Sequence, residues 1–598
     1  MSISLCMIVK NEENNLPRCL QSVKDIVDEM IIVDTGSTDS TVNIAESFGA
    51  KVFHYTWNGS FSDARNHSLR QAGGDWLMIM DADDELEPSG RAAVLELVKN
   101  EDVEAYFFET ISFVGEKPGT DVLKNMNLRL MRNHKGYFFS NPIHEQIYCN
   151  IIAVNPLARI VNKDIRVYHY GYLNKNIAEH NKRSRNIGLL EKELEAKPGH
   201  PFTLFNLGSE YYAMGDNVKA IDYFEQAYAR YNPSEGFSSH LLLKMVHCYM
   251  ALGRFDDAMK LAGAGLSDYP GFTDLEYMRG IICSIQGRHL QAIRHFKKCC
   301  EMGEAPAHLN VIVGTGTYRP HQMLGDIHFG LDDFDAAVQH YGQAFRLNHE
   351  YAPALVMLVR TCCRLGMGQK ELTDYIEVFR PCLPGTFDSI VFEELAACKY
   401  YDLALEYIRR HEEANVVTPY SLYHRGFCEF CLKKLEACYK TMAAAKKGPE
   451  FRVRAACRQA LIFIIRQNYQ KAETLLKMKA AVEDEAFVRV YNAFRVLMET
   501  GEVTVLSEEE KDAALYTPVI FDILKSLLVI HEFEAFEKAL NLLNSVSDKT
   551  VLLKLAKLYY SENCFGLAYQ ELIRSIKLFD CIDLEGSRML NQLKYKGL

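Results

Sequence analysis

Four acidic side chains lie within five residues, directly after the short apolar run of residues 76–80. They are Asp81, Asp83, Asp84 and Glu85. Carboxylates crowded this closely repel one another unless a cation lies between them, and hard divalent ions such as Mg²⁺ and Mn²⁺ take oxygen ligands from carboxylates and phosphates. The cluster therefore predicts a site for a divalent metal and a diphosphate. The alternative is an acidic first turn of a helix that begins near Pro88.

The elements that would position these acids alternate between strand and helix through about the first eighty residues. Apolar runs predict strands at 3–9, 30–33, 51–54 and 76–80, and one-sided apolar spacing predicts helices at 16–23, 42–48 and 62–72. This alternation is typical of a mostly parallel, doubly wound α/β sheet, in which ligands bind at the carboxyl ends of the strands. Further strands are expected at 106–110, 128–132 and 167–172.

Four motifs follow one another in this region: SLCMIVKNEENNL, IIVDTGSTDST, DARNHSL and GDWLMIMDADDEL. In this order they resemble the nucleotide-sugar-binding half of a family 2 glycosyltransferase with the GT-A fold. The resemblance covers about the first ninety residues. It implies transfer of a hexosyl or N-acetylhexosaminyl group from a nucleoside diphosphate sugar, with a UDP-sugar as the expected donor and with inversion at the anomeric carbon.

The resemblance also implies roles for residues that would bind the nucleotide. Asp34, which ends the second strand, is expected to hold the nucleobase, and Asn11 and Glu12 are expected to lie along the base and ribose. Arg65 matches the arginine of an Ala-Arg-Asn segment that lies near the base or pyrophosphate.

By the same resemblance, Asp81 and Asp83 hold the ribose and a metal-bridged diphosphate. Breaking the sugar–phosphate bond builds negative charge on the departing diphosphate, and a cation stabilises that charge most in the transition state. We therefore expect Mn²⁺ or Mg²⁺ as the cofactor. In related GT-A enzymes a late histidine completes the metal shell, which makes His169 the candidate third ligand, although a histidine in a strand is also often simply a packed, hydrogen-bonded residue.

The acceptor must approach from the opposite face of the sugar, where a carboxylate within hydrogen-bonding reach can take its proton. An Ile-His-Glu segment after an Arg-x-x-Arg strand is similar to the repeat-bearing branch of these transferases. Glu145 is the predicted general base and His144 the second catalytic candidate. For either residue the alternative is a buried pair that holds the loop.

A helical repeat begins after Pro198. Gly208, Tyr211, Gly215 and Ala220 stand at positions expected of a tetratricopeptide repeat, which packs two antiparallel helices in about 34 residues. The pattern recurs three more times, and the longest interval contains the insertion 303–318, which we expect to project as a flexible loop. The sequence thus predicts a GT-A-like α/β domain followed by an all-α solenoid.

We predict four regions: a nucleotide-sugar-binding domain at 1–172, a helical linker at 173–197, tetratricopeptide repeats at 198–380, and divergent helical repeats at 381–598. Solenoids of this kind offer a long concave face, and their usual ligands are peptides or protein segments. The expected partners are therefore a nucleotide-sugar donor and a peptide or protein acceptor on the repeats, and self-association stays open.

The composition argues against several classes of protein and indicates a cellular location. The formal net charge of −11 argues against a general nucleic-acid binder. No stretch of about eighteen apolar residues predicts a membrane span, and the N-terminus does not have the pattern of a secretory signal. The 17 cysteines show no disulfide pattern, which favours a reduced, cytoplasmic chain.

The leading hypothesis is an inverting, metal-dependent glycosyltransferase that modifies a Ser, Thr or Cys side chain held by the repeats. Some bacterial transferases with this kind of N-terminal half modify small secreted peptides. One alternative is a transferase that acts on a cell-surface glycan. The other is a non-catalytic scaffold with a degenerate transferase domain, against which the intact Asp34, Arg65, Asp81 and Asp83 count.

Overall fold

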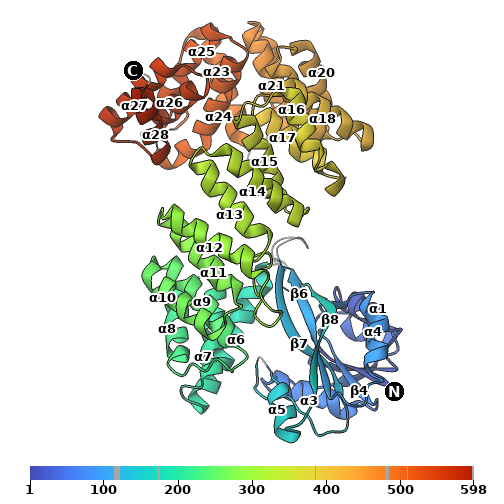
Figure 1. The fold of residues 1–598 in the computed structure, drawn as a ribbon. Coiled ribbons are helices and arrows are strands. Elements are labelled where there is room, and N and C mark those ends of the chain that lie inside the picture. The colour runs from blue at the N-terminus through green and yellow to red at the C-terminus, as the bar shows by residue number, and fades with distance from the viewer. Residues whose placement is uncertain are drawn as a thin grey trace. The chain divides into compact units, whose positions relative to one another are not determined.

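The computed structural model describes residues 1–113, 122–143, 145–171, 176–383, 385–478, 484–507 and 509–595. The chain forms two compact units, Met1–Ala354 and Leu355–Leu598. Every named strand lies in the first unit, in the blue and cyan part of the chain in Figure 1. Within the described residues, no helix is both long enough and apolar enough to cross a bilayer.

The first unit contains one eight-stranded sheet with the strand order β3-β2-β1-β4-β7-β6-β8-β5. The strands are β1 (Ile3–Val9), β2 (Glu29–Asp34), β3 (Lys51–His54), β4 (Trp76–Ile79), β5 (Asp84–Leu86), β6 (Ala105–Phe113), β7 (Val122–Arg132) and β8 (Ile160–His169). Strands β1 to β4 are parallel, as predicted. The other half is mixed, because β7 runs antiparallel to β4 and β6, and β5 runs antiparallel to β8. Strand β5 replaces the acidic helix start that was the alternative for this segment, and the next helix begins only at Gly90.

Alternating strand residues bury their side chains in two different cores, as the two faces of a doubly wound sheet require. In β4, Trp76 and Met78 pack with residues of α1 (Leu16–Val23), α2 (Thr41–Ser47) and α4 (Gly90–Leu97). Leu77 and Ile79 pack on the other face, with residues of α3 (Phe61–Gln71) and α5 (Tyr148–Val154). Both faces of β4 are therefore buried, which fixes the direction in which the turn after it leaves the sheet.

Helix α6 (Asn176–Ala196) leads from the sheet domain into four antiparallel helix pairs. These are α7 (Pro201–Ala213) with α8 (Asn217–Tyr228), α9 (Ser238–Ala251) with α10 (Phe255–Asp268), α11 (Thr273–Ile285) with α12 (His289–Met302), and α13 (Tyr318–Gly330) with α14 (Phe334–Leu347). A glycine lets the two helices of a pair approach closely: a Cβ on Gly208 would lie 2.5 Å from the Phe224 ring, and one on Gly280 would lie 2.6 Å from the Phe296 ring. The predicted tetratricopeptide signature is thus confirmed by its packing.

Helix α15 (Ala352–Arg364) crosses the boundary between the two units, and the described part of the second unit contains only helical elements. They are η1 (Arg380–Cys382), η3 (Leu540–Ser545), α16 (Gln369–Glu377), α17 (Phe387–Ala397), α18 (Tyr401–Ala414), α19 (Pro419–Cys431), α20 (Leu435–Ala445), α21 (Arg452–Ile465), α22 (Tyr469–Leu476), α23 (Glu485–Thr500), α24 (Glu510–Val529), α25 (Phe533–Ala539), α26 (Val551–Ser561), α27 (Phe565–Phe579) and α28 (Leu584–Tyr595). The helical period predicted for the C-terminal part is therefore present.

The insertion 303–318 is bound to the repeats by hydrogen bonds. The prediction that it projects as a flexible loop, made from its glycines, is therefore wrong. The buried Asp274 carboxylate accepts the backbone N–H groups of Val311 and Ile312, each at 2.9 Å, and the Thr315 hydroxyl at 2.6 Å. A Cβ on Gly316 would lie 2.0 Å from the carbonyl carbon of Gly303. Gly316 therefore permits a close approach of two backbone segments.

Lys244 on α9 makes its closest contacts with uncharged groups. Its Nζ donates to Ser209 Oγ at 2.8 Å and lies 4.9 Å from the centre of the Phe205 ring. Burial lowers the pKa of Lys244 from 10.5 to about 8, with Glu210 opposing the shift. The unfolded chain therefore holds this proton more tightly than the folded chain, and the folded state loses stability as the pH falls through 8.

Replacing Lys244 with methionine is therefore expected to stabilise the protein at pH 7, by at most about 3 kcal/mol of unfolding free energy. The advantage should shrink as the pH rises from 8 to 10.5, because the wild-type lysine then folds without a charge. Thermal unfolding of both proteins at pH 7 and pH 10.5 measures the effect. A stabilisation that is equal at the two pH values would contradict it.

Candidate active site

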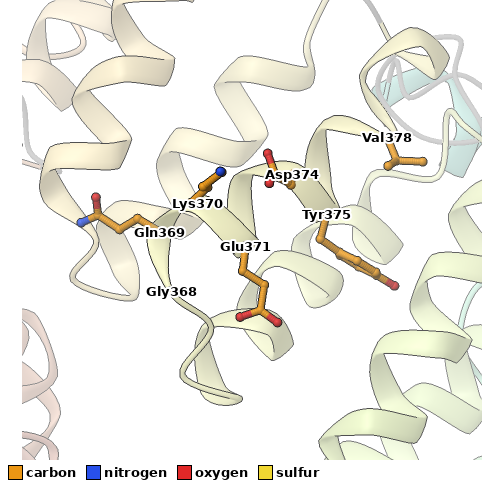
Figure 2. A pocket seen from close by; sticks show the side chains of 7 residues that line it. All are labelled: Gly368, Gln369, Lys370, Glu371, Asp374, Tyr375 and Val378. Carbon is orange, nitrogen blue, oxygen red and sulfur yellow. The ribbon is translucent and has the colours of Figure 1, made fainter.

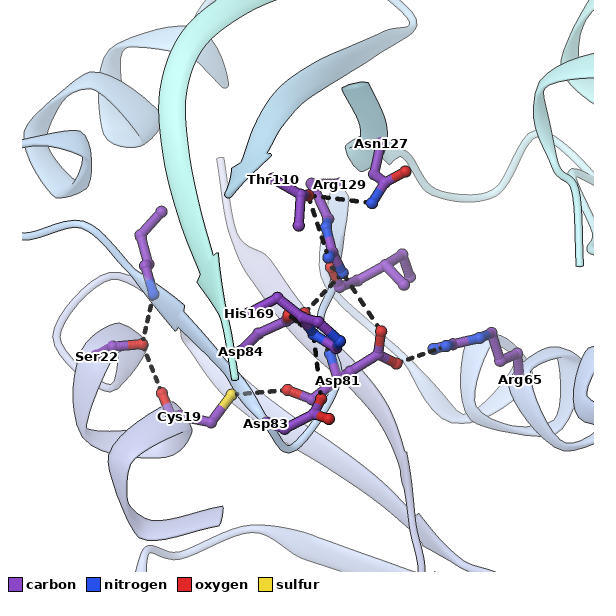
Figure 3. Close-up of polar contacts among 12 residues, drawn as sticks. Cys19, Ser22, Arg65, Asp81, Asp83, Asp84, Thr110, Asn127, Arg129 and His169 are labelled. Atoms are coloured by element: carbon purple, nitrogen blue, oxygen red, sulfur yellow. Dashed lines mark hydrogen bonds and ion pairs between the residues drawn. The ribbon is translucent and has the colours of Figure 1, made fainter. Parts of the chain in front are cut away.

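The acids after β4 lie on a closed turn. The Asp84 N–H donates to the Asp81 carbonyl at 3.1 Å, and the Asp81 N–H donates to Asp84 Oδ2 at 2.8 Å. The Asp84 carboxylate is fully buried, whereas the Asp81 side chain is 35% exposed. Asp84 thus stabilises the turn, and Asp81 and Asp83 lie at the carboxyl end of β4 (Figure 3).

Asp83 and His169, two of the predicted metal ligands, lie together. The β5–β8 pairing places Asp84 directly opposite His169, whose Nδ1 lies 3.0 Å from Asp84 Oδ1 and 3.4 Å from Asp83 Oδ1. Asp83, Asp84 and His169 form the one group of metal-type ligands found in the described residues, with one ligand atom from each within 4.8 Å of the others. Asp81 is not in this group. Its role as a metal ligand stays a prediction, as do those of Asp83 and His169.

Gly171 shows where two of these side chains converge. A Cβ on Gly171 would lie 2.5 Å from Asp83 Oδ2 and 2.6 Å from His169 Nε2. Only a residue without a side chain lets the backbone approach both atoms this closely. Asp84 contacts the Nδ1 atom of His169, as an outer carboxylate contacts a metal-binding histidine. The other ring nitrogen, Nε2, lies next to Gly171, as does Asp83 Oδ2.

We therefore expect Gly171→Ala to weaken Mn²⁺ binding by about tenfold or more, because the new methyl group must displace Asp83, His169 or both. Calorimetric titration with Mn²⁺ measures this. Gly188→Ala on helix α6 is the control, since the backbone there is helical and a Cβ meets nothing within 4 Å. Unchanged Mn²⁺ affinity in a folded Gly171→Ala protein would contradict the convergence of the two ligands.

The electrostatics of the cluster fit a cation site. Burial raises the pKa of the Asp83 carboxyl to about 6, and Asp81, Asp84 and Glu12 add to the shift while His169 opposes it. Burial also disfavours the imidazolium, but the hydrogen bond to Asp84 and the neighbouring carboxylates raise the pKa of His169 to about 9. Without a metal, a protonated His169 therefore partly balances the acids at neutral pH, and a metal that binds His169 would displace this proton.

Two arginines complete the charge balance. Arg65 on α3 bridges two carboxylates: its Nη2 donates to Asp81 Oδ1 at 2.6 Å, and its Nε donates to Glu145 Oε1. Arg129 on β7 lies 2.8 Å from Asp84 and 3.8 Å from Asp81. Burial raises the pKa of the Asp81 carboxyl, but Arg65 and Arg129 outweigh burial and hold it below its usual value. Burial also disfavours the Arg65 cation, but Asp81 and Glu145 raise its pKa.

Arg65 retains one unused donor. Its Nη1 is buried and has no hydrogen-bond partner among the described residues. A buried donor left without a partner is costly, and each such group in a native protein calls for an explanation, of which a bound ligand is one. Nη1 is thus the nitrogen of this guanidinium that neither Asp81 nor Glu145 engages.

Glu145, the predicted general base, is held at this site by Arg65 and is 15% exposed. Its loop is fixed to α3: Phe139 exchanges two hydrogen bonds with the Asn66 side chain, at 2.7 and 2.9 Å, and the Phe61 N–H donates to the Pro142 carbonyl at 2.7 Å. His144, the second catalytic candidate, lies outside the described residues. The role of Glu145 stays a prediction.

The predicted nucleotide-binding residues lie on two loops that are joined to each other at the ends of β1 and β2. Asn11 Oδ1 accepts the Thr38 N–H at 2.7 Å, and the Glu12 N–H donates to Thr41 Oγ1 at 2.7 Å. Since β1 lies between β2 and β4, these loops and the acidic turn share one edge of the sheet. The Glu12 carboxylate adds to the raised pKa of Asp83 in the acidic turn.

Asp34 is buried, and its carboxylate accepts the N–H groups of Gly36 and Ser37 at 3.2 and 3.0 Å. It also lies 3.3 Å from His54 Nδ1, a ring that is 73% exposed. Burial raises the pKa of Asp34, but these hydrogen bonds outweigh it and lower the pKa. Asp34 shapes the loop after β2, and its contact with a nucleobase stays a prediction.

The second unit offers a different kind of surface. A shallow hollow runs along α16 and the residues that flank it (Figure 2). The lining residues are Gly368, Gln369, Lys370, Glu371, Asp374, Tyr375 and Val378. They all come from one short segment and bring together no set of groups comparable to the acidic turn.

Comparisons with known proteins identify the family of the domain that carries this site. Residues 4–155 match the model of glycosyl transferase family 2, and residues 211–279 and 318–351 match tetratricopeptide repeat models. A TPR repeat-containing protein of Synechococcus elongatus is 34% identical over 271 residues, which are 44% of this chain and 66% of that protein. The SPbeta prophage-derived glycosyltransferase SunS of Bacillus subtilis is 29% identical over 291 residues, which are 47% of this chain and 66% of that protein. The chain thus spans slightly less than two thirds of the length of these two relatives.

A third relative is covered more fully. An uncharacterized glycosyltransferase of Rickettsia typhi is 30% identical over 223 residues, which are 35% of this chain and 73% of that protein. The family model covers the acidic turn, Arg65 and Glu145. The chain therefore belongs to glycosyl transferase family 2, with tetratricopeptide repeats after its transferase domain.

Proposed function

We propose that the protein is an inverting, metal-dependent glycosyltransferase that moves a sugar from a nucleoside diphosphate sugar, with UDP as the expected nucleotide, to a peptide or protein side chain held by the repeats. One observation carries the proposal. The cation-type group of Asp83 and His169 lies beside the chain of contacts from Asp81 through Arg65 to Glu145. This arrangement supports a diphosphate site next to a carboxylate base.

The donor atoms fit a divalent metal. The group offers carboxylate oxygens and one imidazole nitrogen, and the nitrogen favours Mn²⁺ over Mg²⁺, which binds almost entirely through oxygen. Asp83 and His169 would hold the ion, while the buried Asp84 keeps His169 oriented. When bound, the ion would supply positive charge against the charge that develops on the departing diphosphate.

The remaining side chains of the site would bind the donor or activate the acceptor. Arg65 would donate its unused Nη1–H to the diphosphate or ribose, and the joined loops of Asn11, Glu12 and Asp34 would hold the nucleoside. Glu145 would take the proton of the acceptor nucleophile, which is general-base catalysis.

The acceptor is the least constrained part of the proposal. A side chain of a peptide or protein is supported by the repeats that follow the transferase domain, since such solenoids commonly bind extended polypeptides. A cell-surface glycan is the alternative acceptor. A cytoplasmic location, predicted from the cysteine pattern, belongs to the same proposal.

A thermal-shift panel of nucleoside diphosphates and their sugars, with and without Mn²⁺, tests the donor site. A ligand that binds only the folded state raises its stability, by about 2.7 kcal/mol at one hundred times its Kd. We expect a shift for uridine nucleotides that depends on Mn²⁺. A folded protein that responds to no nucleotide in either condition would overturn the proposal and favour the scaffold alternative.

A further inference from the structure

An apolar cluster joins the transferase domain to the first repeat. Its buried members are Ile143, Leu190 and Leu207, which are 4%, 0% and 0% exposed. Ile143 belongs to the loop that carries Glu145, Leu190 to α6 and Leu207 to α7. Phe61, at the start of α3, packs against the same cluster. Residues of the catalytic domain and of the repeats therefore share one core.

Both partners of the Arg65–Glu145 ion pair rest on this core. Ile143 precedes Glu145 by two residues, and Phe61 precedes Arg65 by four, which places Phe61 and Arg65 on the same face of α3. The Phe61 N–H also donates to the Pro142 carbonyl, so the start of α3 and the Glu145 loop are joined directly. A shift of the cluster would move both side chains of the pair.

Polar contacts fix α6 against α7 beside the cluster. The buried Glu210 of α7 accepts from Asn186 at 2.8 Å and from Arg183 at 3.3 Å. Arg185 of α6 lies 5.3 Å from the centre of the Phe61 ring, which adds a cation–π contact to α3. Helix α6 is thus held on both sides, by the repeats and by the transferase domain.

We propose that the first repeat positions the Arg65–Glu145 pair, and that Leu207 is the positioning residue that transmits this support through Ile143. The inference rests on the proposed function. The catalytic unit then extends beyond residues 4–155, the part that matches the family model, to include α6 and α7. The repeats are part of the catalytic geometry as well as a surface for the acceptor.

The test replaces Leu207 with alanine, with valine as a milder change in case alanine prevents folding. Met245→Ala is the matched control, because Met245 occupies the equivalent position of α9, is 1% exposed, and belongs to a core cluster that includes neither Ile143 nor Phe61. Leu207→Met serves as the rescue, since it restores volume and apolar character. Three readouts are compared in the full chain: hydrogen–deuterium exchange of residues 139–143 and 145–147, Mn²⁺–UDP binding, and kcat and KM for hydrolysis of a UDP-sugar by water.

We expect faster exchange of the Glu145 loop in Leu207→Ala and a kcat lowered by about tenfold or more, because small misplacements of reacting groups cost rate steeply. The KM for the donor and the affinity for Mn²⁺–UDP should change less than kcat, because Asp83 and His169 lie outside this core and Arg65 is also held by Asp81. Met245→Ala should change neither loop exchange nor kcat, and Leu207→Met should restore both.

Two outcomes would overturn the inference: loop exchange in Leu207→Ala that matches wild type, or a kcat equal to that of Met245→Ala. Failure of the proposed function is seen separately, as a wild-type protein that neither binds nor hydrolyses any nucleotide sugar. If the proposed function fails, hydrogen–deuterium exchange still shows whether Leu207 supports the Glu145 loop.

Discussion

Replacing Asp83 with asparagine is expected to lower sugar transfer by about a thousandfold, which corresponds to about 4 kcal/mol of transition-state stabilisation. Asparagine keeps the size of the side chain and removes the charge that faces His169 beside Gly171. Steady-state transfer, or hydrolysis of the donor by water, measured over a range of Mn²⁺ concentrations gives the effect. The apparent Kd for Mn²⁺ should rise in parallel.

The fold should survive this change. Burial raises the pKa of Asp83 to about 6 from its usual 3.8, so the ionised carboxylate costs stability once the pH rises through 6. Without metal, Asp83→Asn should therefore be at least as stable as wild type at pH 8. Glu85→Gln is the matched control from the same turn, because Glu85 bonds to Tyr170 and lies outside the metal-type group. An Asp83→Asn protein with wild-type turnover and Mn²⁺ affinity would remove the metal site from the mechanism.

The parallel half of the sheet could be predicted because its signals are local. Each of the first strands is an apolar run that ends at a polar residue, and each following helix shows a one-sided apolar spacing. The antiparallel half of the sheet shows no such regular pattern of apolar and polar residues. Strand β5 is only three residues long, and its acidic sequence gives no sign that it pairs with β8.

Asp84 and Arg129 show what sequence reasoning missed in the site. Asp84 is one of four neighbouring acids, and only the pairing of β5 with β8 singles it out as the acid opposite His169. Arg129 was visible only as part of an Arg-x-x-Arg strand. Its contact with Asp84 depends on β7 lying antiparallel to β4, a long-range register that no local pattern encodes.

The bridging role of Arg65 likewise could not be predicted from the sequence. Its position in an Ala-Arg-Asn segment indicated a place near the nucleotide, whereas the structure adds a direct bond to Glu145 from a distant loop. One guanidinium therefore links the acid expected to hold the donor to the acid expected to activate the acceptor. The occupancy of the donor site and the position of the base are coupled through this side chain.

Glu145→Gln removes the predicted base and leaves in its place a side chain that can still bond to Arg65. Glutamine can still accept a hydrogen bond from Arg65 Nε, so the loop and the ion-pair geometry should be largely preserved. An amide does not take a proton from the acceptor, and loss of a general base costs about 10²–10⁴-fold in rate. We expect transfer to fall by about a thousandfold, while Mn²⁺–UDP binding and the melting temperature stay near the wild-type values.

Glu109→Gln provides the comparison, since Glu109 is a half-buried carboxylate of the same domain that pairs with Lys124 at 3.1 Å and lies outside the acidic turn. Its activity should stay within about threefold of wild type. Rescue of Glu145→Gln by an acceptor analogue that is already ionised would place the defect at proton removal. Full activity with an ordinary hydroxyl or thiol acceptor would instead show that Glu145 only anchors Arg65, and the base would have to be sought on another side chain that faces the acceptor.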